Sequence, residues 1–156
     1  MAQYRFLDEW RLPASVERVY DLVGHPLDYP RWWGDVFLAA EGDGGDPAPG
    51  KSVAVRARGY LPYRLRFTLT TLEAERPHRI HSRLNGDFEG TGTWLLEEDG
   101  EGTIARLDWR PDVQKAGVRQ LSPLLRPLFR SNHAWTMRRG LAAALRELGS
   151  GQLGSG

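Results

Sequence analysis

Alternation of apolar and polar side chains recurs along this chain and predicts β-strands. In residues 4–12, Tyr4, Phe6, Trp10 and Leu12 share one parity, while most charged side chains take the other. The same period-two pattern returns in residues 52–59, 63–75, 79–85, 86–96 and 103–110, and a shorter apolar run covers 36–41. Strands with one apolar and one solvated face are typical of an antiparallel sheet.

Two regions follow a helical period instead. Residues 13–24 begin with Pro13 and Ser15, carry valines at helical spacing and end at Gly24, and residues 25–34 predict a second short helix or a pair of turns. Residues 128–148 carry one apolar stripe, formed by Phe129, His133, Met137, Leu141, Ala144 and Leu148. The predicted fold is α+β: about seven antiparallel strands, two short helices after the first strand and one long C-terminal helix.

This order of elements leaves part of the apolar sheet face uncovered. A helix is about 10–12 Å wide, and neighbouring strands lie about 4.7–4.9 Å apart, so one helix covers only two or three strands. The rest of a concave face must curl closed, meet a partner or enclose a cavity.

The segment "GDFEGTGTW", residues 86–94, favours a cavity. Gly86, Gly90 and Gly92 share their parity with Phe88 and Trp94, so all five are expected on the concave side. Glycines there leave volume unfilled and mark a bend or a close approach to the backbone. The alternative is that they only provide curvature against which the helix packs. A phosphate-binding loop is not indicated, because the full glycine spacing and the strand-to-helix turn are missing.

Length, composition and charge narrow the possible functions. The 156 residues fit one domain, expected to span 1–148, and the linker-like residues 149–156 are expected to form a flexible tail. A net charge of +1 gives no reason to expect nucleic acid as a partner. Without a cysteine, a signal peptide or a long apolar run, the chain is expected to be cytoplasmic, a monomer or homodimer, and free of integral membrane association.

Most arginines of the predicted strands take the outward parity. We expect them to form a solvated surface in cross-strand charge pairs with Asp87, Glu89 and Asp108. The outward arginines are Arg56, Arg58, Arg64, Arg66, Arg83, Arg106 and Arg110. The four histidines lack the spacing of metal ligands, so neither a metal site nor a cofactor is predicted.

Three stretches carry a resemblance to a known superfamily: "LPASVERVYDLVGHPLDYPRWW", "GDFEGTGTWLLEEDGEGT" and "LLRPLFRSNHAWTMRRGLAAALREL". Together they resemble the START-like (SRPBCC) superfamily, and the last two look most like its bacterial polyketide cyclase/dehydrase-like branch. The resemblance covers residues 4–148. It implies a helix-grip fold with a deep cavity between sheet and C-terminal helix, entered near the loops and the short second helix, where Trp32 and Trp33 lie.

The residues expected to bind a ligand share the concave face or the cavity entrance. They are Trp10, Trp33, Tyr63, Phe67, Phe88, Gly90, Gly92, Trp94, Trp109, Phe129, His133 and Met137. An apolar, aromatic lining with few orienting polar groups favours binding over hydrolysis.

Two residues are candidates for catalysis. His133 lies in the middle of the apolar helical stripe, where an imidazole would serve as a general acid or base, unless it is a hydrogen-bonded core histidine. Asp8 shares the parity of Phe6 and Trp10 and is expected to point inward from the first strand, unless it lies in solvent at the sheet edge.

Three functional hypotheses follow. The leading one is a carrier or sensor that binds a small apolar ligand of aromatic, polyketide or lipid-like character. The second is a polyketide cyclase or dehydratase that uses the same cavity, with His133 and Asp8 moving protons. The third is a protein-interaction module that docks a partner on the uncovered sheet or on the tryptophans at the entrance.

Overall fold

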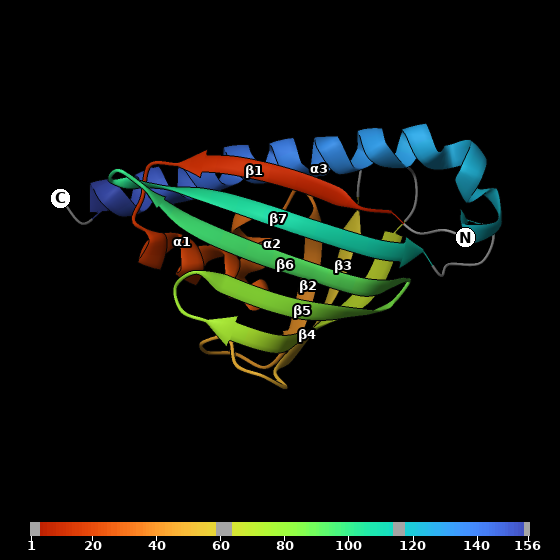
Figure 1. Ribbon diagram of the computed structural model, residues 1–156, viewed down its shortest axis with the longest axis horizontal. Helices are drawn as coiled ribbons and strands as arrows, with labels where there is room; N and C mark the ends of the chain where they lie inside the picture. Colours follow the sequence, from red (N-terminus) through yellow and green to blue (C-terminus); the bar gives the residue numbers. More distant parts are fainter. Residues whose placement is uncertain (1–3, 59–63, 114–117, 155–156) are drawn as a thin grey trace.

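Seven antiparallel strands form one curved sheet in the order β1-β7-β6-β5-β4-β3-β2 (Figure 1). This is a computed structural model that describes residues 4–58, 64–113 and 118–154. The strands are β1 (Phe6–Leu12), β2 (Phe37–Gly42), β3 (Ser52–Arg58), β4 (Arg64–Glu75), β5 (Arg79–Gly86), β6 (Phe88–Asp99) and β7 (Gly102–Val113). The predicted period-two segments are therefore strands of a single sheet.

Short helical elements follow β1, as the sequence predicts. Helix α1 (Val16–Val23) begins where the Ser15 side chain accepts a hydrogen bond from the backbone N–H of Arg18, which satisfies one of the free donors of its first turn. It is followed by a 3₁₀ turn, η1 (Pro26–Asp28), and by the single-turn helix α2 (Tyr29–Trp32). The apolar face of α1 is buried, including Val19.

The C-terminal helix is longer than predicted. Helix α3 runs from Val118 to Gly154, whereas the sequence pattern indicates only residues 128–148. Pro127 indicates a helix that begins after it, because proline lacks a backbone N–H and is disfavoured in a helix interior. A helix that does continue through a proline is usually kinked there. Figure 1 shows the first turns of α3 bent away from the rest of the helix.

The expected flexible tail also begins inside this helix. Residues 149–154 continue α3, although their glycines and serine have low helix propensity. Extending an existing helix adds one hydrogen bond for each residue fixed, so an unfavourable composition does not by itself end it.

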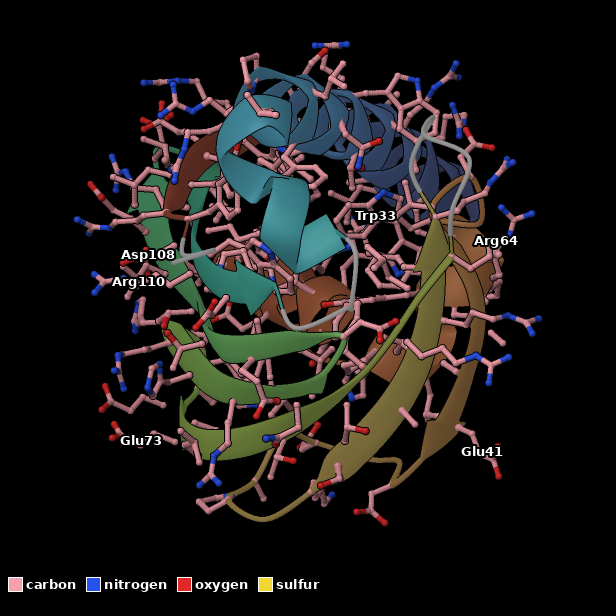
Figure 2. All side chains as sticks on the ribbon, turned by 90° about the vertical axis from the view of Figure 1, so that its right-hand side faces the viewer. Trp33, Glu41, Arg64, Glu73, Asp108 and Arg110 are labelled. Atoms are coloured by element: carbon pink, nitrogen blue, oxygen red, sulfur yellow. The ribbon has the colours of Figure 1, made fainter. Side chains whose placement is uncertain are left out.

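The sheet wraps around α3 and leaves its two edge strands, β1 and β2, unpaired with each other. Seen end-on in Figure 2, α3 lies across the opening between these two sides of the sheet. Gly140 allows α3 to come this close, because a Cβ there would lie 2.5 Å from the Trp33 ring and 2.8 Å from the Trp10 ring. The predicted helix-grip fold is confirmed, and the remaining space lies between α3 and the concave face.

Candidate functional site

A cavity of about 270 Å³ lies between the concave face of the sheet, α3 and the α1–η1–α2 segment. Ligand pockets commonly measure about 300–1,000 Å³, so this one suits a small molecule. Strands β3 to β7 supply one wall, α3 supplies another, and residues 43–47 of the β2–β3 loop complete it.

The wall of the cavity is largely aromatic. Six of the predicted aromatic and aliphatic binding residues line it: Trp33, Phe67, Trp94, Trp109, Phe129 and Met137. Phe67 and Trp109 meet edge to face with their ring centroids 5.9 Å apart, an arrangement that aromatic quadrupoles favour. Period two placed Phe67, Trp94 and Trp109 on the correct face. Helical spacing did the same for Phe129 and Met137, and the family resemblance for Trp33. Their role in binding stays a prediction.

Gly90 and Gly92 of β6 lack a side chain for two different structural reasons. Gly92 lines the cavity, and a Cβ there would lie 2.8 Å from the Trp109 ring, so the missing side chain makes room for that ring. Gly90 is not among the lining residues. It has φ +130°, and its Cβ would lie 2.0 Å from the backbone oxygen of Arg110. Gly90 therefore serves backbone conformation, and its predicted place on the cavity wall is wrong.

Two tryptophans expected at the cavity lie elsewhere. Trp10 is buried but does not line the cavity; it packs between Trp33 and Trp94, with ring centroids 5.5 Å and 5.3 Å away. Trp32, expected at the entrance, is also buried and outside the lining. Both support the residues that do line the cavity. Tyr63 and the Phe88 side chain lie outside the described part of the chain.

The two candidate catalytic residues are brought together. His133 Nε2, from α3, lies 2.6 Å from Asp8 Oδ2, from β1. The Phe6 ring stacks on the imidazole with centroids 4.0 Å apart, and the two side chains are 13% and 22% exposed. His133 lines the cavity, whereas Asp8 lies behind it.

This contact fixes the proton on the imidazole. An ionised carboxylate only accepts hydrogen bonds, so Nε2 must carry the proton that it donates to Asp8. A neutral His133 then has an unprotonated Nδ1 that is able to accept a proton or a hydrogen bond. The same arrangement, a base oriented by a carboxylate behind it, underlies nucleophile activation in many hydrolases.

Polar groups that sequence reasoning missed lie around the α1–α2 connection. The Tyr29 hydroxyl donates a hydrogen bond to the backbone oxygen of Val23, the last residue of α1. Burial raises the pKa of Tyr29 far above its ordinary value, while a hydrogen bond from Trp94 opposes that shift. Tyr29 lines the cavity. The helical spacing of the sequence did not predict that Tyr29 lines the cavity, because η1 changes the direction of the chain just before Tyr29.

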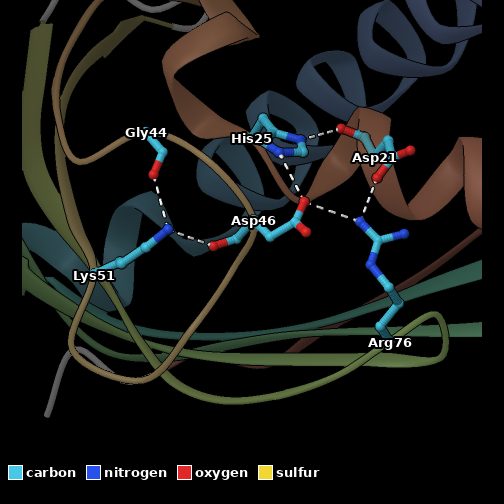
Figure 3. A network of polar contacts seen from close by, with 6 residues as sticks. All are labelled: Asp21, His25, Gly44, Asp46, Lys51 and Arg76. Carbon is cyan, nitrogen blue, oxygen red and sulfur yellow. Dashed lines mark hydrogen bonds and ion pairs between the residues drawn. The ribbon is translucent and has the colours of Figure 1, made fainter.

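The β2–β3 loop forms one end of the cavity and is held by a polar network that we call the loop clip (Figure 3). Arg76 Nη2 contacts Asp21 Oδ1 at 2.5 Å and Asp46 Oδ1 at 3.1 Å. His25 Nε2 lies 3.7 Å from the same Asp46 atom. The Lys51 ammonium donates to the backbone oxygens of Gly44 and Asp46 at 2.9 Å and 2.8 Å.

The clip joins three separate parts of the chain. Asp21 lies on α1, Asp46 in the β2–β3 loop and Arg76 just after β4. The β2–β3 loop, which is rich in glycine and proline, is therefore anchored at the cavity by charged residues that are distant from one another in the sequence. Among the described residues, no group of three or more His, Asp or Glu side chains is arranged to hold a metal ion.

The sequence matches the family described as polyketide cyclase / dehydrase and lipid transport over residues 6–150. The chain belongs to this family. The polyketides and lipids that its description names are largely apolar, which agrees with the predicted ligand class. No curated protein sequence matches the chain.

Solved structures share its fold at low sequence identity. The Zhui aromatase/cyclase from Streptomyces sp. R1128 is 15% identical with a TM-score of 0.74, over 93% of both chains. The protein TTHA0849 from Thermus thermophilus is 20% identical with a TM-score of 0.71, over 92% of this chain and 99% of that one. These identities show a common fold and nothing more.

A larger protein contains the same fold. The di-domain ARO/CYC BexL from the BE-7585A biosynthetic pathway is 18% identical, with a TM-score of 0.72, and the match covers 93% of the present chain. The chain spans about half of BexL, since the match covers 50% of that protein.

No helix within the described residues is both long and apolar enough to cross a membrane.

Proposed function

We propose that this chain binds a small, flat apolar molecule of aromatic or polyketide-like character in the cavity under α3. The observation that carries the proposal is the partly enclosed space of about 270 Å³ lined by Trp33, Trp94 and Trp109. Indole faces favour flat apolar ligands. The Trp33 N–H donates to the backbone oxygen of Thr136 at 3.3 Å and Trp94 hydrogen-bonds Tyr29, so these two rings offer the ligand their faces. Family membership supports the same class of ligand.

Polar groups at two places would orient such a ligand. Near α3 the lining includes Asn132, His133 and Thr136, and on the sheet it includes Thr71 and Ser82. A few polar groups in an apolar wall select a molecule with matching substituents, because an unmatched buried polar group costs free energy.

Filling the cavity tests this proposal. Ser82 lies on the cavity wall, so Ser82→Phe places an aromatic ring in the space reserved for the ligand. Ser52→Phe is the matched control, because Ser52 lies on the outer face of β3, where its hydroxyl meets that of Thr70. We expect Ser82→Phe to abolish the tryptophan fluorescence change caused by a polycyclic aromatic probe such as anthraquinone, and Ser52→Phe to retain it.

Native mass spectrometry of protein purified from its own host extends the test to the physiological ligand. A co-purifying apolar compound that is lost in Ser82→Phe and kept in Ser52→Phe supports a carrier. Equal probe binding by both variants would contradict the cavity as the binding site.

A second candidate function is proton transfer to the bound ligand, and the contact between His133 and Asp8 favours it. In an aldol closure, Nδ1 of His133 would take a proton from the carbon between two carbonyls. The resulting carbanion would attack a second carbonyl, and the imidazolium, stabilised by Asp8, would return the proton to the alkoxide. Such general acid–base assistance contributes about 10²–10⁴-fold to a rate.

Three variants separate catalysis from binding. We expect His133→Ala to lower cyclisation of a poly-β-ketone by about 10²-fold or more and Asp8→Asn to lower it as well, while both variants still bind the aromatic probe. His81→Ala is the control, since His81 hydrogen-bonds Thr93 on the outer face. Unchanged cyclisation by His133→Ala would leave binding as the function.

A further inference from the structure

Two pairs of arginines face each other on the outer side of the β3–β4 hairpin. Arg56 lies directly opposite Arg66, and Arg58 lies directly opposite Arg64. All four are exposed, and Figure 2 shows Arg64 on the outside of the sheet. Like charges placed opposite one another destabilise a sheet, so this arrangement does not serve the stability of the fold. We call these four residues the arginine strip.

Other arginines of the outer face have carboxylate partners. Arg79 pairs with Glu73 at 2.6 Å, and Arg106 pairs with Glu97 at 2.7 Å. Asp108 accepts hydrogen bonds from Arg110, and their contact holds the pKa of that carboxyl below its usual range. Cross-strand charge pairs are therefore present, but with Glu73 and Glu97 as the carboxylates. Of the expected partners, Asp108 pairs with Arg110 of its own strand.

The arginine strip has no such partners. Among the described residues, no carboxylate forms an ion pair with any of its four guanidinium groups. Arg58 donates to the backbone oxygen of Asp35 at 3.0 Å, and Asp87 accepts from the backbone N–H of Arg66 at 2.9 Å. Asp87 thus meets the strip through the Arg66 backbone, and among the described residues it forms no ion pair with any of the four guanidinium groups.

A shallow depression of about 460 Å³ adjoins the strip on the same face. Arg56 and Arg66 line it together with small residues, including Ala39, Ala54 and Gly86. Small side chains allow the backbone of a partner to approach the sheet closely. The depression therefore offers contact area beside exposed positive charges.

We propose that the arginine strip and this depression form a docking surface for an acidic segment of a partner protein. Guanidinium groups match carboxylates in paired hydrogen bonds, and a carboxylate between two opposed arginines relieves their mutual repulsion. Phe67 and Leu65, on the inner side of the same hairpin, line the ligand cavity. A docked partner would thus lie against the outside of the cavity wall.

The chemistry of this surface favours a protein over a membrane or a nucleic acid. The large apolar side chains that are exposed in the described residues, such as Leu7, Leu95 and Leu124, lie on other elements, whereas membrane-binding surfaces insert apolar side chains. Glu41 lines the depression and would repel a continuous phosphate backbone. Among the described residues, the one aromatic side chain that lines the depression is Phe67, which is buried, so a base meets no exposed ring there on which to stack.

Binding of a fluorescein-labelled deca-glutamate peptide tests the proposal by fluorescence anisotropy. We expect the double substitution Arg56→Glu and Arg66→Glu to weaken binding roughly tenfold or more at low salt, because it replaces attraction by repulsion. Arg138→Glu with Arg146→Glu is the matched control: it changes the net charge equally at two exposed positions of α3 and is expected to leave binding unchanged.

Three outcomes would overturn the proposal. They are equal weakening by the control, no binding of the peptide, and tighter strip-dependent binding of phosphatidylserine vesicles or of an oligonucleotide than of the peptide. Arg58 of the strip also lines the ligand cavity, but the substituted residues Arg56 and Arg66 do not, so these outcomes test the docking surface separately from ligand binding.

A milder variant keeps the test informative if the double variant does not fold. Arg56→Gln removes one of two opposed charges, so we expect the thermal midpoint to rise by about 1–3 °C while peptide binding weakens. A gain in stability together with a loss of affinity would indicate that the opposed arginines contribute to binding and not to the stability of the fold. Arg56→Gln that binds the peptide as well as the original chain would contradict the proposal.

Discussion

At the residue scale, single side chains determine whether backbone groups around the cavity are satisfied. Tyr29 shows this best, because its hydroxyl contacts the backbone oxygen of Val23, which ends α1. The residue is buried and also lines the cavity. Stability and shape of the site therefore depend on the same hydroxyl group.

Removing that hydroxyl should destabilise the protein in a pH-dependent way. Tyr29→Phe leaves the carbonyl of Val23 without its donor, at a cost of about 1–3 kcal/mol. Burial raises the pKa of Tyr29 above its ordinary value of 10.0, so the unfolded chain loses this proton first as pH rises. The stability contributed by Tyr29 is thus fully present below pH 10 and declines above it.

Urea unfolding at pH 7 and at increasing pH above 10 measures this effect. We expect the difference between wild type and Tyr29→Phe to shrink as the pH rises, because only the wild type loses the contribution of Tyr29. Tyr29→Trp is not a suitable control, since it adds volume. A constant difference across this range would contradict the assigned shift.

The two glycines of β6 should respond differently to alanine. Gly90→Ala forces a Cβ against a backbone oxygen 2.0 Å away at a positive φ. We therefore expect the free energy of unfolding to fall by about 1–3 kcal/mol. Gly92→Ala meets only the Trp109 ring, which is able to shift into the cavity. We expect it to change probe affinity more than stability, as urea unfolding and fluorescence titration would show. The reverse ranking would contradict the two roles.

At the element scale, local patterns predicted most strands and helices, and their ends were harder to place. Period two identified β3 and the first half of β4 because buried and exposed side chains alternate there. The ends of α3 were wrong, since proline and glycine lower helix propensity without fixing where a packed helix stops. Element type depends on local periodicity, whereas element length also depends on packing.

The loop clip should control the mobility of the β2–β3 loop more than global stability. Arg76→Ala removes both contacts of Arg76 with carboxylates, yet exposed ion pairs contribute only about 0–1 kcal/mol each. We expect faster hydrogen exchange at Asp43 and Gly50, whose amides bond to Ser52 and Thr71, with little change in the unfolding midpoint.

Arg79→Ala is the matched control for this experiment. Arg79 also pairs with a carboxylate, Glu73, but touches no part of the loop. Equal exchange rates in the two variants would show that the clip does not hold the loop.

At the scale of the whole molecule, the outer face and the inner face of one sheet differ in chemistry. The inner face and α3 enclose an apolar cavity. The outer face is charged, and charges around β6 and β7 form ion pairs, whereas the four residues of the arginine strip on β3 and β4 have no carboxylate partner among the described residues. Net charge alone, at +1, conceals this division. Only the strand order shows which charges are neighbours.

The candidate site was predicted in part. Parity placed Phe67, Trp94 and Trp109 on the cavity wall, because alternation assigns a face to every residue of a strand. It misplaced Gly90 and Trp10. A positive φ takes a residue out of simple alternation, and a buried face holds both lining residues and the residues packed behind them.

The sequence by itself determined the faces: alternation and helical spacing specify which side chains are buried, and so imply a curved sheet with a covering helix. Only the tertiary structure decided which of those buried side chains meet. Asp8 and His133 are 125 positions apart, the segments joined in the loop clip are likewise distant in sequence, and no local period encodes such contacts. The physical reason is that burial is favoured by each side chain's own chemistry, whereas a contact requires two backbones to be brought together by the packing of all the others.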